Sequence, residues 1–138
     1  MVVTILRYLW ASPTTLMGLL FVGLALVSGG RARVRQGAIE CHGGMVSLLL
    51  RRVVPLKGGA MALTLGHVIL GASAAALDVA RAHEHIHVRQ CERWGPFFLP
   101  AYVVASVVAA VKGGHFYRDN VFEREAYART GRIGDGRS

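Results

Sequence analysis

The sequence predicts an α+β protein that is anchored in a membrane. Three observations predict this class: an uncharged apolar block near the start, a glycine-rich middle part with strand-like segments, and helical segments in the second half. Hydrophobic residues make up 53% of the 138 residues and charged residues only 17%, whereas globular chains carry about 25% charged residues. This composition excludes a disordered chain and argues against an ordinary soluble domain.

Residues 8–30 form the first apolar block and carry no charge. As a helix they would span roughly 34 Å, which exceeds the hydrocarbon core of about 30 Å. A cleaved signal peptide is the alternative, but no small-residue cleavage pattern ends the block, and Arg31, Arg33 and Arg35 follow it directly. Basic residues beside an apolar segment favour the cytoplasmic side. We therefore expect a transmembrane anchor over residues 1–30, in the cell membrane, with the rest of the chain in the cytoplasm.

The charge balance points to lipid as a partner. Sixteen Lys and Arg against eight Asp and Glu give a net charge of +8, and the first acidic residue is Glu40. Basic residues next to an apolar block attract anionic headgroups. No zinc-finger spacing, RNP-type motif or aromatic-basic interleaving supports nucleic-acid binding. We expect contact with the lipid bilayer and none with nucleic acid.

Short strands are predicted for residues 31–70. Residues around Gly37 alternate in polarity, and Leu-Thr-Leu and Val-Ile-Leu follow a glycine-rich entry. Residues 58–77 are also uncharged, so a second transmembrane helix is the alternative, which four glycines and an interior His67 disfavour. We expect two or three strands. Residues 45–54 fit either a further strand or a short helix on the membrane surface.

From Ser73 the pattern becomes helical. Ser73 can cap a helix that Gly95-Pro96 ends. A second apolar segment follows at residues 94–111, and two prolines disturb its start. Asp119 or Asn120 can then cap a last helix that ends at Gly131. We expect residues 132–138 to be disordered.

The residues with catalytic potential lie on the helix after Ser73. His83-Glu84-His85-Ile86-His87 is an H-E-x-x-H motif, and His83 and His87 share one helix face, so both imidazoles can bind one zinc ion. Glu84 can take a proton from water and pass it to a leaving amine. His85 is expected to point away from this face into solvent. A third ligand is needed, and Cys91 lies about 12 Å along the helix from His83, too far to share the ion.

The last helix carries Glu123-Arg124-Glu125-Ala126-Tyr127. Together with H-E-x-x-H, this segment resembles the gluzincin pattern of the zincin metallopeptidases, in which a glutamate of an E-x-x-A-D motif is the third ligand. The resemblance implies that His83, His87 and Glu123 bind zinc and that Glu125 is a neighbour. Tyr127 stands where the family usually has aspartate. Residues 60–128 are also similar to a group of small uncharacterised bacterial membrane proteins.

What the resemblance implies is a membrane-anchored zinc metallopeptidase with a minimal zincin-like domain over residues 31–131, a hydrolase of peptide bonds with Glu84 as the general base. By the same resemblance, Leu65 to Leu70 would be an edge strand that pairs with a peptide substrate. A packed hairpin strand without a role in substrate binding is the alternative for these residues. Tyr117, Tyr127 and His115 are candidates for stabilising an oxyanion. Arg89 and Gln90 fit either substrate contacts or an exposed helix face.

One constraint concerns topology. A single crossing by residues 94–111 would put Glu123 on the opposite side of the membrane from His83 and His87, so a zinc site predicts that this segment dips in and returns, or lies against the H-E-x-x-H helix. The metal's identity stays open, because His₂Glu sites accept several divalent ions. The alternative function is a non-enzymatic membrane protein, with or without a structural zinc, that mediates lipid or protein contacts.

Overall fold

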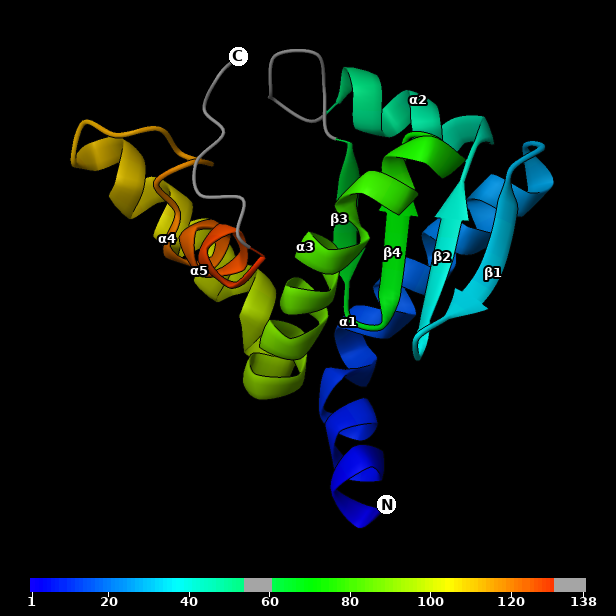
Figure 1. The fold of residues 1–138 in the computed structure, drawn as a ribbon, viewed down its shortest axis with the longest axis horizontal. Helices are drawn as coiled ribbons and strands as arrows, with labels where there is room; N and C mark the ends of the chain where they lie inside the picture. Colours follow the sequence, from blue (N-terminus) through cyan, green and yellow to red (C-terminus); the bar gives the residue numbers. More distant parts are fainter. Residues whose placement is uncertain (54–60, 131–138) are drawn as a thin grey trace.

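The computed structural model describes residues 1–53 and 61–130 and has a mixed α+β architecture (Figure 1). A four-stranded sheet is covered by α1 and α2 on one face and by α3 on the other, and α4 and α5 lie beyond α3. This confirms the predicted α+β class. In chain order the elements are α1 (Val2–Val27), β1 (Arg31–Arg35), β2 (Ala38–His42), α2 (Gly44–Arg52), β3 (Ala62–Leu65), β4 (Val68–Gly71), α3 (Ala74–Trp94), η1 (Gly95–Phe97), α4 (Phe98–Val111) and α5 (Val121–Arg129).

The second half of α1 belongs to the folded core. One buried residue recurs every three or four positions and forms a single face that packs on the sheet. Gly18 marks the closest approach, because a Cβ there would lie 2.6 Å from Cβ of Val68 on β4. The first seven residues are exposed and project from the fold (Figure 1), whereas Tyr8 stacks on the ring of His67 and Trp10 donates a hydrogen bond to the carbonyl of Arg93. The buried face consists of Ala11, Thr14, Gly18, Val22 and Ala25.

Within residues 1–53 and 61–130, two helices are long and apolar enough to cross a membrane. They are α1 and the stretch Ala74–Val111, which α3, η1 and α4 form together. The longest uncharged part of that stretch is residues 94–111. The transmembrane anchor and its cytoplasmic orientation stay predictions.

The sheet has more strands than the two or three predicted. Its order is β1-β2-β4-β3, with antiparallel pairs at both edges and a parallel pair of β2 with β4 in the centre. Because residues 62–71 form the β3–β4 hairpin, a transmembrane helix over residues 58–77 is wrong. The expected single strand from Leu65 to Leu70 is also wrong. Gly66, with φ +63°, reverses the chain inside it, so the edge strand is β3 and not residues 65–70.

Side chains alternate between the two faces of the sheet. On one face Val68 and Leu70 pack with α1 and with Val46 and Leu50 of α2. This decides between the two options for residues 45–54: a short helix forms over Gly44–Arg52, and residue 54 lies outside the described residues. On the other face Ile69 packs against α3. The sheet thus supports α3 directly and fixes its position.

Two polar residues fix the helix starts near the candidate site. The hydroxyl of Ser73 accepts a hydrogen bond from the backbone N–H of Ala76 at 3.0 Å, which confirms the predicted cap of α3. Of the two candidates for the cap of α5, Asn120 is the cap, since its Oδ1 accepts from the N–H of Phe122 at 2.9 Å. The predicted disorder of residues 132–138 lies outside the described residues.

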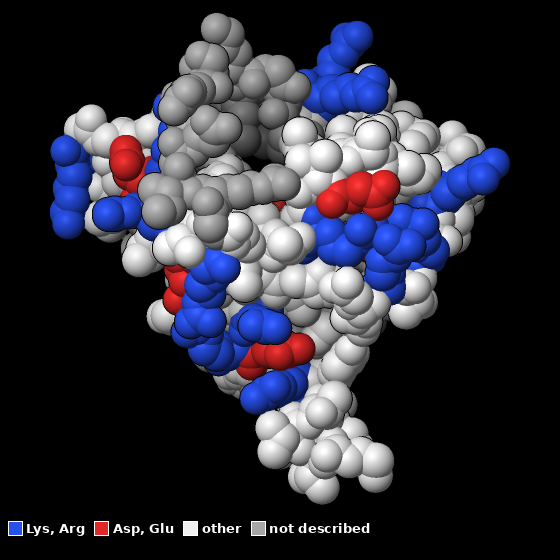
Figure 2. Space-filling view, in the orientation of Figure 1, with Lys and Arg blue, Asp and Glu red and all other residues white. Residues whose placement is uncertain are grey.

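Part of the arginine run after the first helix is engaged within the protein. Arg33 and Arg35 of β1 lie within 3.9 Å of Asp78, and Arg81 makes two hydrogen bonds to the buried carboxylate of Glu40. Figure 2 shows the basic side chains gathered over β1, β2 and the first turns of α3. These arginines therefore tie the sheet to α3, in addition to any contact with headgroups.

Candidate metal centre

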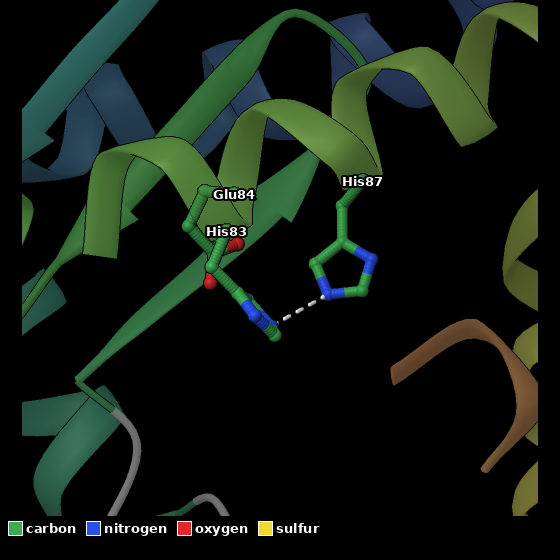
Figure 3. A group of neighbouring side chains, drawn as sticks. All are labelled: His83, Glu84 and His87. Atoms are coloured by element: carbon green, nitrogen blue, oxygen red, sulfur yellow. Dashed lines mark hydrogen bonds between the residues drawn. The ribbon is translucent and has the colours of Figure 1, made fainter. Parts of the chain in front are cut away.

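His83, Glu84 and His87 lie together on α3, in a buried group that could hold a metal ion (Figure 3). One potential ligand atom from each of the three residues lies within 4.8 Å of the others. The spacing of four residues stacks the two histidines on one helix face, as the sequence predicts. Their Nε2 atoms are 3.2 Å apart. Both atoms therefore point at the same small volume.

Glu123 of α5 completes a triangle with the two imidazoles. Its Oε2 lies 2.9 Å from Nε2 of His83, and its Oε1 lies 3.0 Å from Nε2 of His87. Ligand atoms about 2.0–2.1 Å from a tetrahedral ion lie about 3.3 Å from one another. The three observed separations are close to this value. The structure thus brings together all three residues that the resemblance selected as ligands.

The turn before α5 holds this helix in place. Asn120 is fully buried, and its side-chain amide donates to the carbonyl of Tyr102 at 3.1 Å and to the hydroxyl of Ser106 at 2.8 Å. Both partners lie one turn apart on α4. Because Asn120 also caps α5, one side chain fixes the start of α5 against α4, three residues before Glu123.

Two residues of the triangle, His87 and Glu123, have strongly shifted pKa values. Burial alone would raise the pKa of Glu123, but hydrogen bonds from His83 and His87 lower it to about 2. Burial alone would lower the pKa of His87, whereas the hydrogen bond and the charge of Glu123 raise it to about 9. A proton on His87 therefore balances the buried carboxylate. A cation that entered the triangle would take the place of that proton.

Two hydroxyl groups orient the carboxylates at the site. Tyr102 donates from its hydroxyl to Oε1 of Glu123 at 2.7 Å. Thr64 of β3 donates to Oε2 of Glu84 at 2.5 Å, so the edge strand of the sheet touches the motif directly. One carboxylate oxygen of Glu84 is thereby fixed. Its other oxygen has no hydrogen-bond partner among the described residues.

Gln90 does not behave as the sequence suggested. An exposed helix face or a substrate contact was expected, but the side chain is fully buried and contacts His87. The signal that could have found it is its spacing, since Gln90 follows His83 by seven residues and His87 by three, on the same face. A polar residue on the same helix face as two predicted ligands is a candidate for contacting them.

Tyr127 lies beside His83 without bonding to it. The two ring centroids are 4.4 Å apart, and the Tyr127 hydroxyl meets that of Tyr117 at 3.2 Å. Nδ1 of His83 is buried and has no hydrogen-bond partner among the described residues. Tyr127, which stands where the gluzincin pattern has aspartate, offers this nitrogen no hydrogen bond. The position thus lacks the acceptor that normally orients a histidine ligand.

Two other histidines play no part in the triangle. His85 is half-buried rather than solvated, because it lines a separate cavity of about 270 Å³ with Tyr8, His67 and Glu92. The Nδ1 atom of His115 accepts from the backbone N–H of Tyr117 at 3.1 Å, which is a local turn contact. Of the three candidates for stabilising an oxyanion, Tyr117 and Tyr127 lie next to each other, whereas His115 accepts a hydrogen bond within its own loop.

Comparisons of this chain with protein-family models, with curated proteins and with solved structures gave no match.

Proposed function

We propose that the protein is a membrane-anchored, zinc-dependent peptidase. One observation carries the proposal: the Nε2 atoms of His83 and His87 and the carboxylate of Glu123 form a buried triangle with sides of 2.9–3.2 Å. Two neutral imidazoles and one carboxylate are a common ligand set of catalytic zinc, and they leave the fourth position open.

Each residue has a definite role in this proposal. When bound, zinc would polarise the substrate carbonyl and lower the pKa of water. Glu84 accepts a proton from the attacking water through the carboxylate oxygen that Thr64 leaves free. The same carboxyl group then donates the proton to the leaving amine. Tyr102 holds the carboxylate of Glu123 toward the two imidazoles.

The edge strand β3 supports an extended peptide as the substrate. The N–H of Ala72 donates to the carbonyl of Met61 at 2.9 Å, and Leu63 pairs with Leu70 two positions further on. Bonded pairs alternate with non-bonded ones in an antiparallel ladder, so the backbone groups of Ala62 and Thr64 point away from β4. An extended peptide can pair with such an edge. The side chain of Thr64 would place that peptide next to Glu84.

The surface of α4 supports a bilayer beside the site. One face of α4 carries Tyr102 and Ser106 and builds the centre, while its opposite face is apolar and exposed. Exposed apolar patches of this kind mark protein or membrane contacts. The substrate we propose is therefore a peptide segment near the membrane surface. The exposed residues are Val103, Val104, Val107, Val108 and Val111.

A structural metal site in a non-enzymatic membrane protein is the second candidate. It is favoured by burial, because His83, His87 and Glu84 are at most 6% exposed and Glu123 is 3% exposed. Side chains buried to this extent leave a substrate little access to the site. This candidate shares the ligands with the first, but it assigns no role to Glu84.

The test compares three variants of the detergent-purified protein. Glu84→Gln is expected to keep about one zinc per chain and to lose hydrolysis of fluorescein-labelled casein by at least about 10²-fold, because the proton acceptor is gone. His87→Ala is expected to lose both zinc and hydrolysis. His85→Gln, on the same helix but outside the triangle, is the control and should keep both.

Two outcomes would contradict the proposal. Full hydrolysis by Glu84→Gln would remove Glu84 as the base and favour the structural site. Undiminished zinc in His87→Ala would remove the ligand assignment itself.

A further inference from the structure

We infer that Gln90 is the residue that positions His87 for metal binding and joins the two ligand-bearing helices. The inference rests on the proposed metal site and adds a residue that its ligand set does not include. Gln90 is fully buried, on the same face of α3 as His83 and His87. Its side-chain amide makes three hydrogen bonds, and their directions can be worked out one by one.

The orientation of the amide is fixed by α5. The amide nitrogen of Gln90 lies 3.0 Å from the carbonyl oxygen of Phe122 and 2.9 Å from Oε1 of Glu125. Both of these atoms can only accept hydrogen bonds at neutral pH. The group that faces them must therefore be the NH₂, which donates one hydrogen to each. A flipped amide would place its oxygen against two other oxygens.

With the nitrogen fixed, the amide oxygen must face His87. Oε1 of Gln90 lies 2.8 Å from Nδ1 of His87. A carbonyl oxygen only accepts, so Nδ1 must carry the hydrogen. The lone pair of a neutral imidazole is then on Nε2, which is the atom that points into the triangle. Gln90 thus selects the tautomer in which His87 can act as a ligand.

A salt bridge on α5 supports the same arrangement. Oε1 of Glu125 also accepts from Arg93 at 2.6 Å, and Arg93 lies on α3 three residues after Gln90. The second glutamate of the E-x-E-A segment therefore holds the Gln90 amide and not the metal. The chain of contacts runs from Arg93 through Glu125 and Gln90 to His87.

The bond to Phe122 sets the distance between the helices. Its carbonyl belongs to the residue directly before Glu123, so the amide of Gln90 holds the backbone of α5 next to the ligand position. The side chain of Gln90 therefore orients His87. It also fixes the position of Glu123 relative to His87. Loss of such a partner usually weakens metal binding by about 10- to 100-fold.

The test uses two near-isosteric variants and one control. Gln90→Met keeps the length of the side chain and removes the amide, and Gln90→Glu keeps an acceptor for Nδ1 of His87. Arg89→Gln changes the exposed neighbour. Zinc dissociation constants are measured by competition with a chromophoric chelator. ¹⁵N-histidine NMR of the zinc-loaded protein reports the Nδ1–H of His87, which a purely packing role for Gln90 would leave unchanged.

We expect Gln90→Met to weaken zinc binding by about 10- to 100-fold and to lose the protected Nδ1–H resonance. Gln90→Glu should keep that resonance although it loses both hydrogen bonds to α5, so it tests the bond to His87 separately from the bonds between the helices. Arg89→Gln should match the wild type. Wild-type zinc affinity and an unchanged resonance in Gln90→Met would overturn the inference while the metal site stood. No zinc in the wild type would overturn both.

Discussion

The carboxylate of Glu123 lies 2.9 Å from Nε2 of His83, although 40 residues separate the two in the chain. The chain between them leaves α3 at Gly95, follows α4 and returns through the turn that Asn120 pins to α4. The contact means that the two helices carrying the triangle end on the same side of any membrane that α4 enters. Membrane topology and the proposed metal centre are therefore linked in this protein.

The first prediction concerns that topology. Single cysteines replacing Arg89 on α3 and Arg118 before α5, both exposed, should react with an impermeant maleimide from the same side of membrane vesicles. The natural Cys41 and Cys91 are fully buried and give a low background. Labelling from opposite sides would mean that residues 94–111 cross once, and it would separate Glu123 from the histidines.

The second prediction uses the orphaned Nδ1 of His83. Tyr127→Asp places a carboxylate acceptor next to that ring, so zinc should bind up to about tenfold more tightly. Tyr127→Leu, which offers no acceptor, is the matched control and should not tighten binding. The measurement is a competition titration with a chelator. Equal affinities for the two variants would mean that position 127 does not reach His83.

The third prediction concerns pH and the metal-free protein. The pKa of His87 is raised to about 9, so its contribution to the free energy of unfolding is complete below its ordinary pKa of about 6.5 and is lost as the pH rises through 9. The pKa of Glu123 is lowered to about 2, so its contribution is present above about 4.5 and lost as the pH falls toward 2. Stability should be greatest between these two ordinary pKa values.

Thermal unfolding after chelation, followed by circular dichroism from pH 5 to 9.5, checks this window. The unfolding free energy should fall by up to about 3 kcal/mol between pH 6.5 and 9.5. Glu123→Gln removes the charge that raises the pKa of His87, so that variant should show a much flatter curve. If the unfolding free energy of the wild type depended on pH in the same way as that of Glu123→Gln, His87 and Glu123 would not form the charged pair that the structure implies.

The fourth prediction separates a packed helix from a simple anchor. Gly18→Leu places side-chain atoms where Cβ of Val68 already lies, and we expect it to destabilise the fold by about 1–3 kcal/mol. Gly23→Leu is the control on the same helix, because a Cβ there meets no atom within 4 Å. Thermal unfolding in one detergent compares the two. Equal stability would mean that α1 does not pack on the sheet.

Local signals in the sequence predicted the parts that depend on neighbouring residues. Ser73 caps α3 because a serine hydroxyl satisfies a free N–H of the first turn, and Gly95 ends that helix because its φ of +57° suits glycine. The i,i+4 spacing of His83 and His87 likewise needs only helix geometry. These features follow from a few consecutive residues.

The parts that failed depend on residues far apart in the chain. Gly66 is a local signal for a turn between Leu65 and Val68, but nothing in residues 65–70 shows that β4 lies between β3 and β2. Gln90 looked like an exposed residue because its partners, Phe122 and Glu125, lie more than thirty positions later. The packing of one face of α1 on the sheet was also not visible in residues 8–30, because the strands that bury that face come later in the sequence; the membrane anchor itself stays a prediction.

The most direct test of the metal centre is zinc stoichiometry. Mass spectrometry of the detergent-purified, metal-supplemented protein would compare the wild type with Glu123→Gln and with Glu125→Gln, whose amide oxygen can still accept from Gln90. We predict about one zinc per chain in the wild type and in Glu125→Gln, and a large loss in Glu123→Gln. A folded wild type without zinc, or undiminished zinc in Glu123→Gln, would contradict the account.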